Sequence, residues 1–401
     1  MKKKLAVLVS HPIQYQTPLF KKIVEQLEID LKVYFCWDFG IKEKYDAEFG
    51  RKIKWDIPLL EGYDYKFLKN YSFKPSSDFW GQINPGIISE IYKNKYDAVL
   101  IFGWNSLTNW LAFLTAFIIG TPVFLRGENP LNQEILKDSS KLAVKRVILG
   151  SLFKFIKAFL YIGQENKKFY QYYGVAEKRL FFAPYAIDNE RFMEEAKKLK
   201  KEKAKTKKDL KIDAKKSVIL FIGKLIDKKR PMDLLKAYEK TKNRKVKKSK
   251  QIALIFVGDG HLREELENYT KSNNIKDVYF LGFKNQTEIM KYYSIGDTIV
   301  LPSGSGETWG LVLNEAMCFG LPLVISDAVG AGPDLVQNDK NGFIYPVGDI
   351  ENLYFCLNFI DDKKKIDFFG KNSLKIIKKY SFDNDVKAIL GTLKSLKNNL
   401  K

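Results

Sequence analysis

Short apolar runs recur along the chain, separated by stretches in which apolar residues return with helical spacing. Most runs are apolar at nearly every position, which is typical of strands covered on both faces in a parallel sheet. We expect strands at residues 5–10, 31–37, 96–102, 123–125, 159–162, 218–222, 252–257, 299–301, 321–325 and 343–346. Helical patterns lie between them, for example at 19–27, 141–157, 289–294 and 350–360. This alternation predicts an α/β fold with parallel sheets.

The uncharged stretch at 103–125 is long enough to suggest a membrane span. Asn105 and Asn109 lie inside it, and Gly-Thr-Pro at 120–122 interrupts it. These features favour a buried helix of about 14 residues followed by a short strand. A true membrane span is the alternative.

The formal net charge of +21 is concentrated in a few segments. Residues 197–216 carry eleven lysines against three acids, but no nucleic-acid-binding motif accompanies them. Binding to an anionic membrane surface and simple solvation are the two remaining interpretations.

Residues 141–157 carry five bases and no acid. The apolar positions 144, 148, 152, 155 and 159 follow helical spacing, and further apolar residues widen the arc. This helix therefore either lies on a membrane or packs on a sheet with its lysines outward.

Three cysteines, Cys36, Cys318 and Cys356, have no metal-ligand spacing and form no even set. They indicate a reducing compartment without a disulfide framework. The basic start at 1–4 precedes an apolar run that is too short for a signal peptide. We therefore expect a cytoplasmic protein.

Residues 299–325 are expected to form one strand–loop–helix–strand unit, with its helix at 309–319. Ligands collect at the carboxyl edge of parallel strands, and a helix N-terminus attracts anions, so a phosphate is expected at the loop. Glu307 in the loop and Glu315 in the helix can accept hydrogen bonds from hydroxyl groups. A diphosphate between two polyhydroxyl rings would use all these features. The alternative is that Glu307 only complements the helix dipole and Glu315 is a surface residue.

A second anion-binding turn is expected after 218–222. Gly223, Lys224 and Lys229 stand there before a helix that begins near Met232. Two cations beside a helix start suit a phosphate, although each could be an ordinary surface lysine. Gly-Asp-Gly at 258–260 follows the next strand and is also compatible with a plain turn.

Residues 307–317 read Glu-Thr-Trp-Gly-Leu-Val-Leu-Asn-Glu-Ala-Met, and Gly-Leu-Pro-Leu-Val follows at 320–324. This string resembles the donor-site signature of glycosyltransferase family 4. These are retaining enzymes of the GT-B fold. The resemblance covers most of the C-terminal half and is weaker in the N-terminal half. It implies an α/β protein of two doubly wound, Rossmann-like domains facing across a cleft. It also implies hexosyl transfer from a nucleotide-diphosphate sugar. Because the sequence has no metal-binding motif, we expect no metal or other cofactor.

By this resemblance Lys224, where the family has arginine, and Lys229 would hold the donor diphosphate. Glu307, with the backbone amides of 308–310, would hold the sugar ring, and Glu315 would accept the ribose hydroxyls. The implied donor-binding residues are Gly223, Lys224, Lys229, Gly258, Gly260, Phe283, Glu307, Thr308, Trp309, Gly310, Leu311, Val312 and Glu315.

Candidates for the acceptor side lie in the first half of the chain. His11, Gln14 and Tyr15 follow the first strand, and Arg126 and Glu128 follow the strand at 123–125. His11 and Glu128 are candidates for catalytic proton transfer, and Arg126 could hold a phosphate or an acidic acceptor. A loop-bracing histidine and a structural salt bridge are the alternatives. The aromatic-rich stretch at 38–83 has no clear period and could also recognise the acceptor.

The length of 401 residues favours two domains. Residues 184–192 resemble the family's interdomain connection, which places the boundary near Ile187. We expect an acceptor-side domain at 1–187, a solvated Lys-rich linker at 188–216 and a nucleotide-sugar domain at 217–380. By resemblance, a C-terminal helix at 381–401 packs back on the first domain. Asp-Asn-Asp at 383–385 is expected to cap that helix rather than bind a metal.

The predicted function is transfer to a saccharide or lipid-linked acceptor during cell-surface polysaccharide synthesis, peripherally on the inner membrane face. An epimerase or phosphorylase of the same fold and a non-catalytic membrane-surface scaffold are the alternatives. The sequence leaves open the donor base and sugar, the acceptor, and the choice between front-face and double-displacement chemistry.

Overall fold

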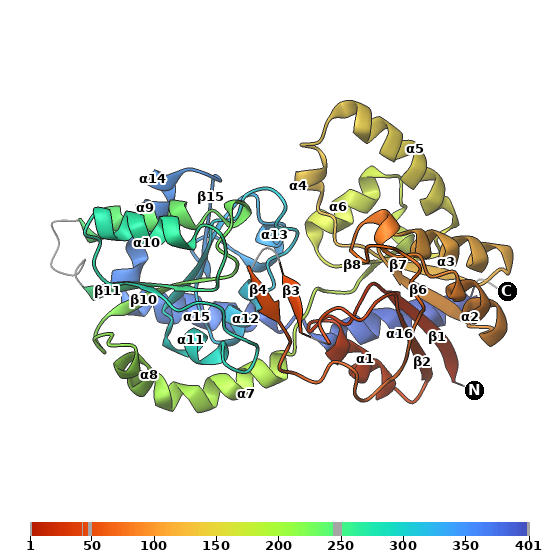
Figure 1. Cartoon of the computed structure of the whole chain (residues 1–401), viewed down its shortest axis with the longest axis horizontal. Helices are drawn as coiled ribbons and strands as arrows, with labels where there is room; N and C mark the ends of the chain where they lie inside the picture. Colours follow the sequence, from red (N-terminus) through yellow and green to blue (C-terminus); the bar gives the residue numbers. More distant parts are fainter. Residues whose placement is uncertain (1, 42, 47–49, 244–250, 399–401) are drawn as a thin grey trace. The chain divides into compact units, whose positions relative to one another are not determined.

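The computed structural model describes residues 2–41, 43–46, 50–243 and 251–398, and the chain divides into two compact units. The first unit comprises Met1–Lys44, Ile57–Ala186 and Ser381–Lys401, and the second comprises Tyr45–Asp56 and Ile187–Tyr380. Each unit is built on its own parallel sheet with helices on both faces (Figure 1). The doubly wound α/β prediction is confirmed.

The first unit contains a parallel sheet in the order β5-β2-β1-β6-β7-β8-β9. The strands are β1 (Lys3–Val9), β2 (Ile29–Phe35), β5 (Asp64–Phe67), β6 (Ala98–Phe102), β7 (Val123–Arg126), β8 (Ala158–Tyr161) and β9 (Leu180–Phe182). The helices include α1 (Thr17–Val24), α2 (Gly86–Asn94), α3 (Leu107–Ile118), α4 (Leu131–Glu134), α5 (Ser139–Phe155), α6 (Gln164–Tyr172) and α16 (Phe382–Asn398). The strand β9 is short and only half-buried, so its apolar run is too brief for the sequence pattern to predict.

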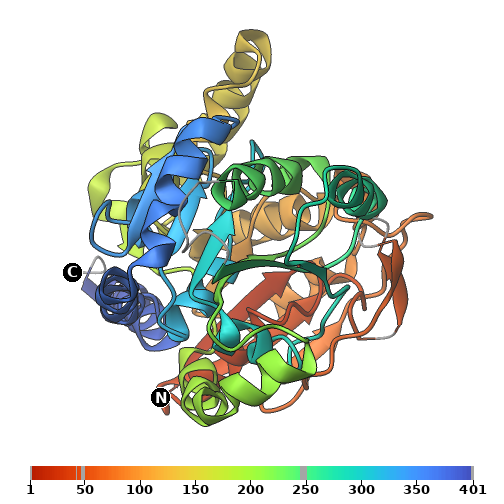
Figure 2. The ribbon, with the colours of Figure 1, turned by 90° about the vertical axis from the view of Figure 1, so that its left-hand side faces the viewer.

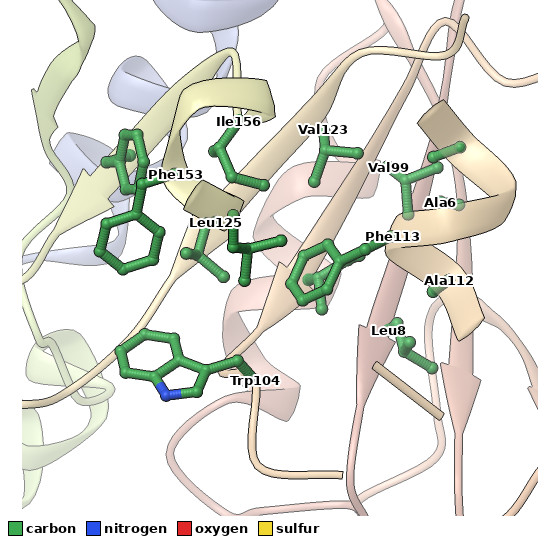
Figure 3. Close-up of a cluster of buried hydrophobic side chains, with 14 of the residues drawn as sticks. Ala6, Leu8, Val99, Trp104, Ala112, Phe113, Val123, Leu125, Phe153 and Ile156 are labelled. Carbon is green, nitrogen blue, oxygen red and sulfur yellow. The ribbon is translucent and has the colours of Figure 1, made fainter. Parts of the chain in front are cut away.

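Both faces of this sheet are buried, as the continuous apolar runs predict. Alternate residues of β1 supply two separate cores, with Ala6 and Leu8 in one and Leu5 and Val7 in the other. Figure 3 shows the first core, where Phe113 of α3 packs over the strands. The uncharged stretch at 103–125 is thus α3 and β7. Within the described residues, no helix is long and apolar enough to cross a membrane.

The second unit contains a parallel sheet in the order β12-β11-β10-β13-β14-β15. The strands are β10 (Ser217–Ile222), β11 (Ile252–Val257), β12 (Val278–Phe280), β13 (Thr298–Leu301), β14 (Leu323–Ser326) and β15 (Gly342–Tyr345). The helices include α7 (Asn189–Leu199), α8 (Lys203–Asp209), α9 (Pro231–Lys242), α10 (Arg263–Ser272), α11 (Met290–Ile295), α12 (Val312–Cys318), α13 (Gly332–Leu335), α14 (Ile350–Cys356) and α15 (Lys363–Ile377). Helices α9 and α10 cover one face of the sheet, and α7, α8 and α11 cover the other (Figures 1 and 2).

The segment 188–216 belongs to the second unit rather than standing apart as a linker, and most of its lysines are exposed to solvent. It forms α7 and α8, which pack against α11 and α12 within the second unit. Two of its lysines bind local acceptors: Lys203 pairs with Asp297 at 3.0 Å, and buried Lys207 donates to the Lys216 carbonyl at 2.6 Å. These two contacts help to fix α8 on the second unit.

The C-terminal helix α16 belongs to the first unit, where it packs on α1, β8 and β9. The capping prediction for residues 383–385 is wrong for Asp385. Ser381 caps the helix instead, because its Oγ accepts from the Asn384 backbone N–H at 3.4 Å. Asp385 is buried and pairs with Arg126 of β7 at 2.6 Å. This ion pair fixes the helix to the carboxyl end of the sheet.

Residues 38–83 contain the hairpin β3 (Lys44–Asp46) and β4 (Arg51–Ile53) before β5. Most of this hairpin falls in the second unit. Its end is held there by Asn285, which donates to the Lys54 carbonyl at 2.7 Å, and by Thr287, whose backbone N–H donates to Asp56 at 3.1 Å. No periodic pattern predicts this excursion, because both strands are only three residues long.

Candidate functional site

The candidate donor site lies at the carboxyl edge of the second sheet. The chain leaves β10 toward β11 on one side of the sheet, whereas β13 lies on the other side of β10. The strand order therefore reverses between β10 and β13, and ligands of open α/β sheets bind at such a switch point. The loop after β10 carries Lys224 and Lys229, and the loop after β13 carries Glu307. The structure thus brings the two predicted segments to the same point.

Lys229 and Glu307 form an ion pair across this switch point through Nζ and Oε2. Their side chains are only 15% and 10% exposed. The same Glu307 oxygen accepts a hydrogen bond from Ser303 Oγ at 3.1 Å. Partial burial strengthens such a pair because solvent screens it less. The charges are therefore preorganised rather than spread over flexible surface side chains.

Backbone hydrogen bonds fix the loops that carry this pair. The Gly304 N–H donates to the Lys228 carbonyl at 2.7 Å, which joins the loops after β13 and β10. The Gly330 N–H donates to the Glu307 carbonyl at 3.0 Å, which joins the loop after β14. Three neighbouring loops thus hold the backbone around one cation and one carboxylate. Lys224 is half-buried in the first of these loops.

The two predicted glycines after β11 have a structural reason to be glycine. A Cβ at Gly258, where φ is +139°, would lie 1.8 Å from the Gly223 carbonyl oxygen. A Cβ at Gly260 would lie 2.4 Å from the Leu225 carbonyl oxygen. The Leu225 N–H also donates to the Asp259 carbonyl at 2.8 Å. These glycines allow the loops after β10 and β11 to pack directly against each other, and Gly258 donates to the Gly282 carbonyl, beside Phe283.

Glu315 lies inside the protein rather than on the helix surface. It is 2% exposed and accepts hydrogen bonds from the Tyr293 hydroxyl at 2.5 Å and from Gln286 Nε2 at 3.4 Å. The surface-residue alternative for Glu315 is therefore wrong. Tyr293 and Gln286 were not foreseen, because neither belongs to a motif and both come from the preceding loop and helix. The proposed contact of Glu315 with ribose stays a prediction.

The helix that carries Glu315 is shorter than expected. It begins at Val312 rather than Trp309, because residues 307–311 form a loop with Gly310 at φ +89°. Trp309 is buried and its Nε1 donates to Asn314 at 2.9 Å, so its side chain packs inside the protein. Thr308 and Leu311 remain half-buried at the edge of the sheet.

In the first unit, His11 and its neighbours follow β1. The His11 ring is half-buried, its Nδ1 lies 3.0 Å from Ser10 Oγ, and its edge meets Trp37 and Phe39 at ring distances of 5.6 and 5.2 Å. These contacts brace the loop. Gln14 and Tyr15 are also half-buried. None of these contacts tests the proposed acceptor-side role.

Arg126 does not face an open site, and the structure corrects this acceptor-side prediction. The side chain is 4% exposed, pairs with Asp385 and donates to the Pro184 carbonyl at 3.3 Å. Its guanidinium also lies over the Phe102 ring at 5.6 Å. The structural salt bridge, which was the alternative, is the arrangement found.

Glu128 follows β7, and its protonation equilibrium is perturbed, as is that of Asp385 at the same edge. Burial raises the pKa of Glu128, while a hydrogen bond from the Tyr185 side chain and the charge of Arg126 oppose the shift. Burial also raises the pKa of Tyr185. A carboxyl group with a raised pKa at the carboxyl edge of a parallel sheet is a candidate for proton transfer. Tyr185 was not foreseen, since its only sequence signal is its place in the connection at 184–192.

Within the described part of the chain, no group of three His, Cys, Asp or Glu side chains is arranged to hold a metal ion. The three cysteines are separate from one another, with Cys36 and Cys318 buried and Cys356 half-buried.

The two parallel sheets with their helices define the GT-B class of fold. The crystal structure of Anabaena Alr3699/HepE in complex with UDP has a TM-score of 0.73 and 20% identity, and the match covers 98% of this chain and 100% of that one. At this identity the likeness shows the fold alone.

Residues 202–373, inside the second unit, match the family model described as "Glycosyl transferases group 1". Sulfoquinovosyl transferase SQD2 of Arabidopsis thaliana is 31% identical over 171 residues, which are 42% of this chain and only 31% of that protein. UDP-Gal:alpha-D-GlcNAc-diphosphoundecaprenol alpha-1,3-galactosyltransferase of Escherichia coli is 26% identical over 284 residues, or 70% of each chain. The matched family and these relatives are glycosyltransferases, which supports a transferase.

Proposed function

We propose that this protein is a retaining glycosyltransferase that moves a hexosyl-type group from a nucleotide-diphosphate sugar to a saccharide or lipid-linked acceptor. The observation that carries the proposal is the Lys229–Glu307 pair at the switch point of the second sheet. It supplies a cation for the diphosphate and a carboxylate for sugar hydroxyls within one preorganised site. The group 1 family match over this unit supports the same interpretation.

Lys229 and Lys224 are proposed to stabilise the charge that grows on the leaving diphosphate. Breaking the bond between sugar and phosphate leaves negative charge on the phosphate oxygens, so fixed cations there lower the barrier. We propose that these lysines act without a metal ion. Cations already held by three joined loops need little rearrangement when the charge develops.

Glu307 is proposed to leave Lys229 when the donor binds and to accept hydrogen bonds from the sugar ring. Glu315, positioned by Tyr293 and Gln286, is proposed to accept the ribose hydroxyls. A carboxylate held by two donors keeps its direction, which favours one orientation of the nucleoside. Retention can follow either from front-face attack or from two successive displacements, and the charge at Lys229 serves both routes.

Glu128 is the proposed proton acceptor for the attacking hydroxyl, with His11 as the second candidate in the first unit. The raised pKa of Glu128 makes it a stronger base than an ordinary surface carboxylate. Gln14 and Tyr15, on the same loop as His11, are proposed to contact the acceptor.

A lipid-linked acceptor is favoured by the surface of α5. Val144 and Val147 are 61% and 70% exposed, and Phe155 is 66% exposed, on a helix that carries bases and no acid. The buried apolar residues of the same helix are Leu149, Leu152 and Phe153. Exposed apolar and basic residues together suit an anionic membrane surface, so we propose peripheral action there in surface-polysaccharide synthesis. The name of the E. coli relative includes a diphosphoundecaprenol-linked acceptor.

The test is release of UDP or GDP from a panel of sugar nucleotides, with and without a chelator. We expect one donor to be turned over and the chelator to leave the rate unchanged. Glu307→Ala should abolish turnover and Lys229→Ala should weaken donor binding severely. Lys240→Ala removes an exposed ion pair with Glu351 in the same unit and should change neither. Unchanged rates in both site variants would contradict the assignment.

A further inference from the structure

The first unit contains an open cavity of about 700 Å³ between α5, the start of α3 and the loop at 77–79. Its apolar lining comes from Phe79, Trp104, Trp110, Val144, Ile148 and Leu149. We call this cavity the α5 groove. Figure 1 shows α5 along the outside of the first unit, above α3 and α6. The groove thus lies on the helix that carries the exposed apolar residues.

The aromatic floor of the groove is rigid. Trp104 stacks on Phe169 at 5.8 Å and meets the edge of Phe153 at 5.8 Å, and the latter contact is visible in Figure 3. Trp110 Nε1 donates to the Trp104 carbonyl at 3.0 Å. Because these rings are held by one another, the groove is formed without a ligand, and a guest would lose little energy in shaping it.

The groove begins close to the carboxyl edge of the first sheet. A Cβ at Gly127 would lie 2.7 Å from the six-membered ring of Trp104, so Trp104 covers the backbone directly before Glu128. A molecule that lies along Trp104 therefore has one end near the proposed proton acceptor. This position suits the acceptor itself better than a bulk membrane lipid.

The mouth of the groove is both apolar and basic. Val144 is 61% and Ile148 47% exposed. Lys141 and Lys145 also line the groove, and Asp78 is the acid among the lining residues. Lys145 already pairs with buried Glu134 at 2.6 Å, so Lys141 is the exposed cation at this position. An apolar body with an anionic head would match both features.

We propose that the α5 groove holds the isoprenoid tail of a lipid-linked diphosphate acceptor, with Lys141 near its diphosphate. The tail would lie along Trp104 and Trp110 and between Val144 and Ile148. The inference rests on the proposed function, because it names the acceptor class and assigns its lipid to a specific surface.

The test is calorimetric titration of the full chain with farnesyl diphosphate, a soluble isoprenoid diphosphate. We expect saturable binding that Val144→Asp and Ile148→Asp each weaken by roughly tenfold or more, because each removes apolar contact and adds a negative charge. Val147→Asp is the matched control, since Val147 is 70% exposed on the same helix but does not line the groove. It should bind like the parent protein.

Two further arms separate this site from others. The titration is repeated in the Lys229→Ala background, where binding should persist although the donor site is impaired. Inorganic diphosphate should compete only weakly with farnesyl diphosphate, because it lacks the apolar tail. Absence of saturable binding, loss in the Lys229→Ala background, full competition by inorganic diphosphate, or an equal loss in Val147→Asp would overturn the groove. Release of nucleotide from a sugar nucleotide in water needs no acceptor, so it tests the proposed function separately.

Discussion

The substitution Glu307→Gln tests whether the ion pair in the donor site is a functional element or only a brace. In the structure Glu307 neutralises Lys229. An incoming diphosphate must therefore displace the carboxylate from the ammonium group, and it meets a second negative charge as it does so. Glutamine has nearly the same shape but no charge. It should therefore ease binding of the free nucleoside diphosphate while it impairs the reaction.

The size of the effect follows from the geometry. Two unit charges about 4 Å apart interact by roughly 1 kcal/mol in water and about 4 kcal/mol at an effective dielectric constant near 20. The side chains are 15% and 10% exposed, which places the pair between these limits. Ser303 also loses a charged acceptor. A net gain of about 1–2 kcal/mol predicts roughly 5- to 30-fold tighter binding of UDP or GDP. A hydrogen bond to a charged group contributes about 1.5–3 kcal/mol, so kcat should fall by roughly ten- to a hundredfold.

Calorimetric titration with UDP and GDP measures the affinity, and nucleotide release from the active sugar donor measures kcat. Glu351→Gln is the matched control, because Glu351 pairs with Lys240 on the surface of the same unit and is 60% exposed. It should leave both quantities unchanged. The reasoning fails if Glu307→Gln weakens nucleotide binding and lowers the melting temperature together. That result would make Glu307 a brace for the loop.

Three further changes test other parts of the structure. Arg126→Met should lower the free energy of unfolding by about 3–5 kcal/mol in urea, because it leaves Asp385 buried without its partner. Adding Asp385→Leu should restore most of the loss. Gly258→Ala should cost more than about 2 kcal/mol and abolish nucleotide binding in calorimetry, because its Cβ would overlap the backbone of the loop after β10. If Glu128 is the base, activity should fall as the pH drops through its raised pKa. Glu128→Gln should then remove this acidic limb from the pH–rate profile. If the limb is unchanged in the variant, another group is responsible for it.

The sheets could be predicted from the sequence because strands buried on both faces leave continuous apolar runs. The runs that become β1, β10 and β11 are the clearest examples, with cores on either side. The two loops of the donor site could be predicted for a related reason. A strand followed by small residues and a charged side chain places that side chain at the carboxyl edge of a parallel sheet.

The long-range partners could not be predicted, because no local pattern encodes them. Arg126 and Asp385 are 259 positions apart, and each has a plausible local role at an acceptor site or a helix cap. The sequence pattern predicts helices at 350–360 and after 383, but it does not predict α15, which lies between them. In α5, residues 144, 148, 152 and 155 share one helical spacing, but only Leu152 of these is buried, and it packs together with Leu149 and Phe153. Two apolar stripes on one helix give the same period, so only tertiary contacts decide between them.

The same limit applies to the donor site, whose full construction draws on distant parts of the chain. Gln286 reaches Glu315, while its neighbours Asn285 and Thr287 hold the end of the hairpin at 45–56. The loop that orients a proposed ribose-binding carboxylate is therefore fixed by residues that come from the sequence between β2 and β5. A donor-binding unit defined only by the continuous stretch 187–380 would lack this support. Because residues between β2 and β5 support this site, the site is better defined by its contacts than by the residue range of the signature motif.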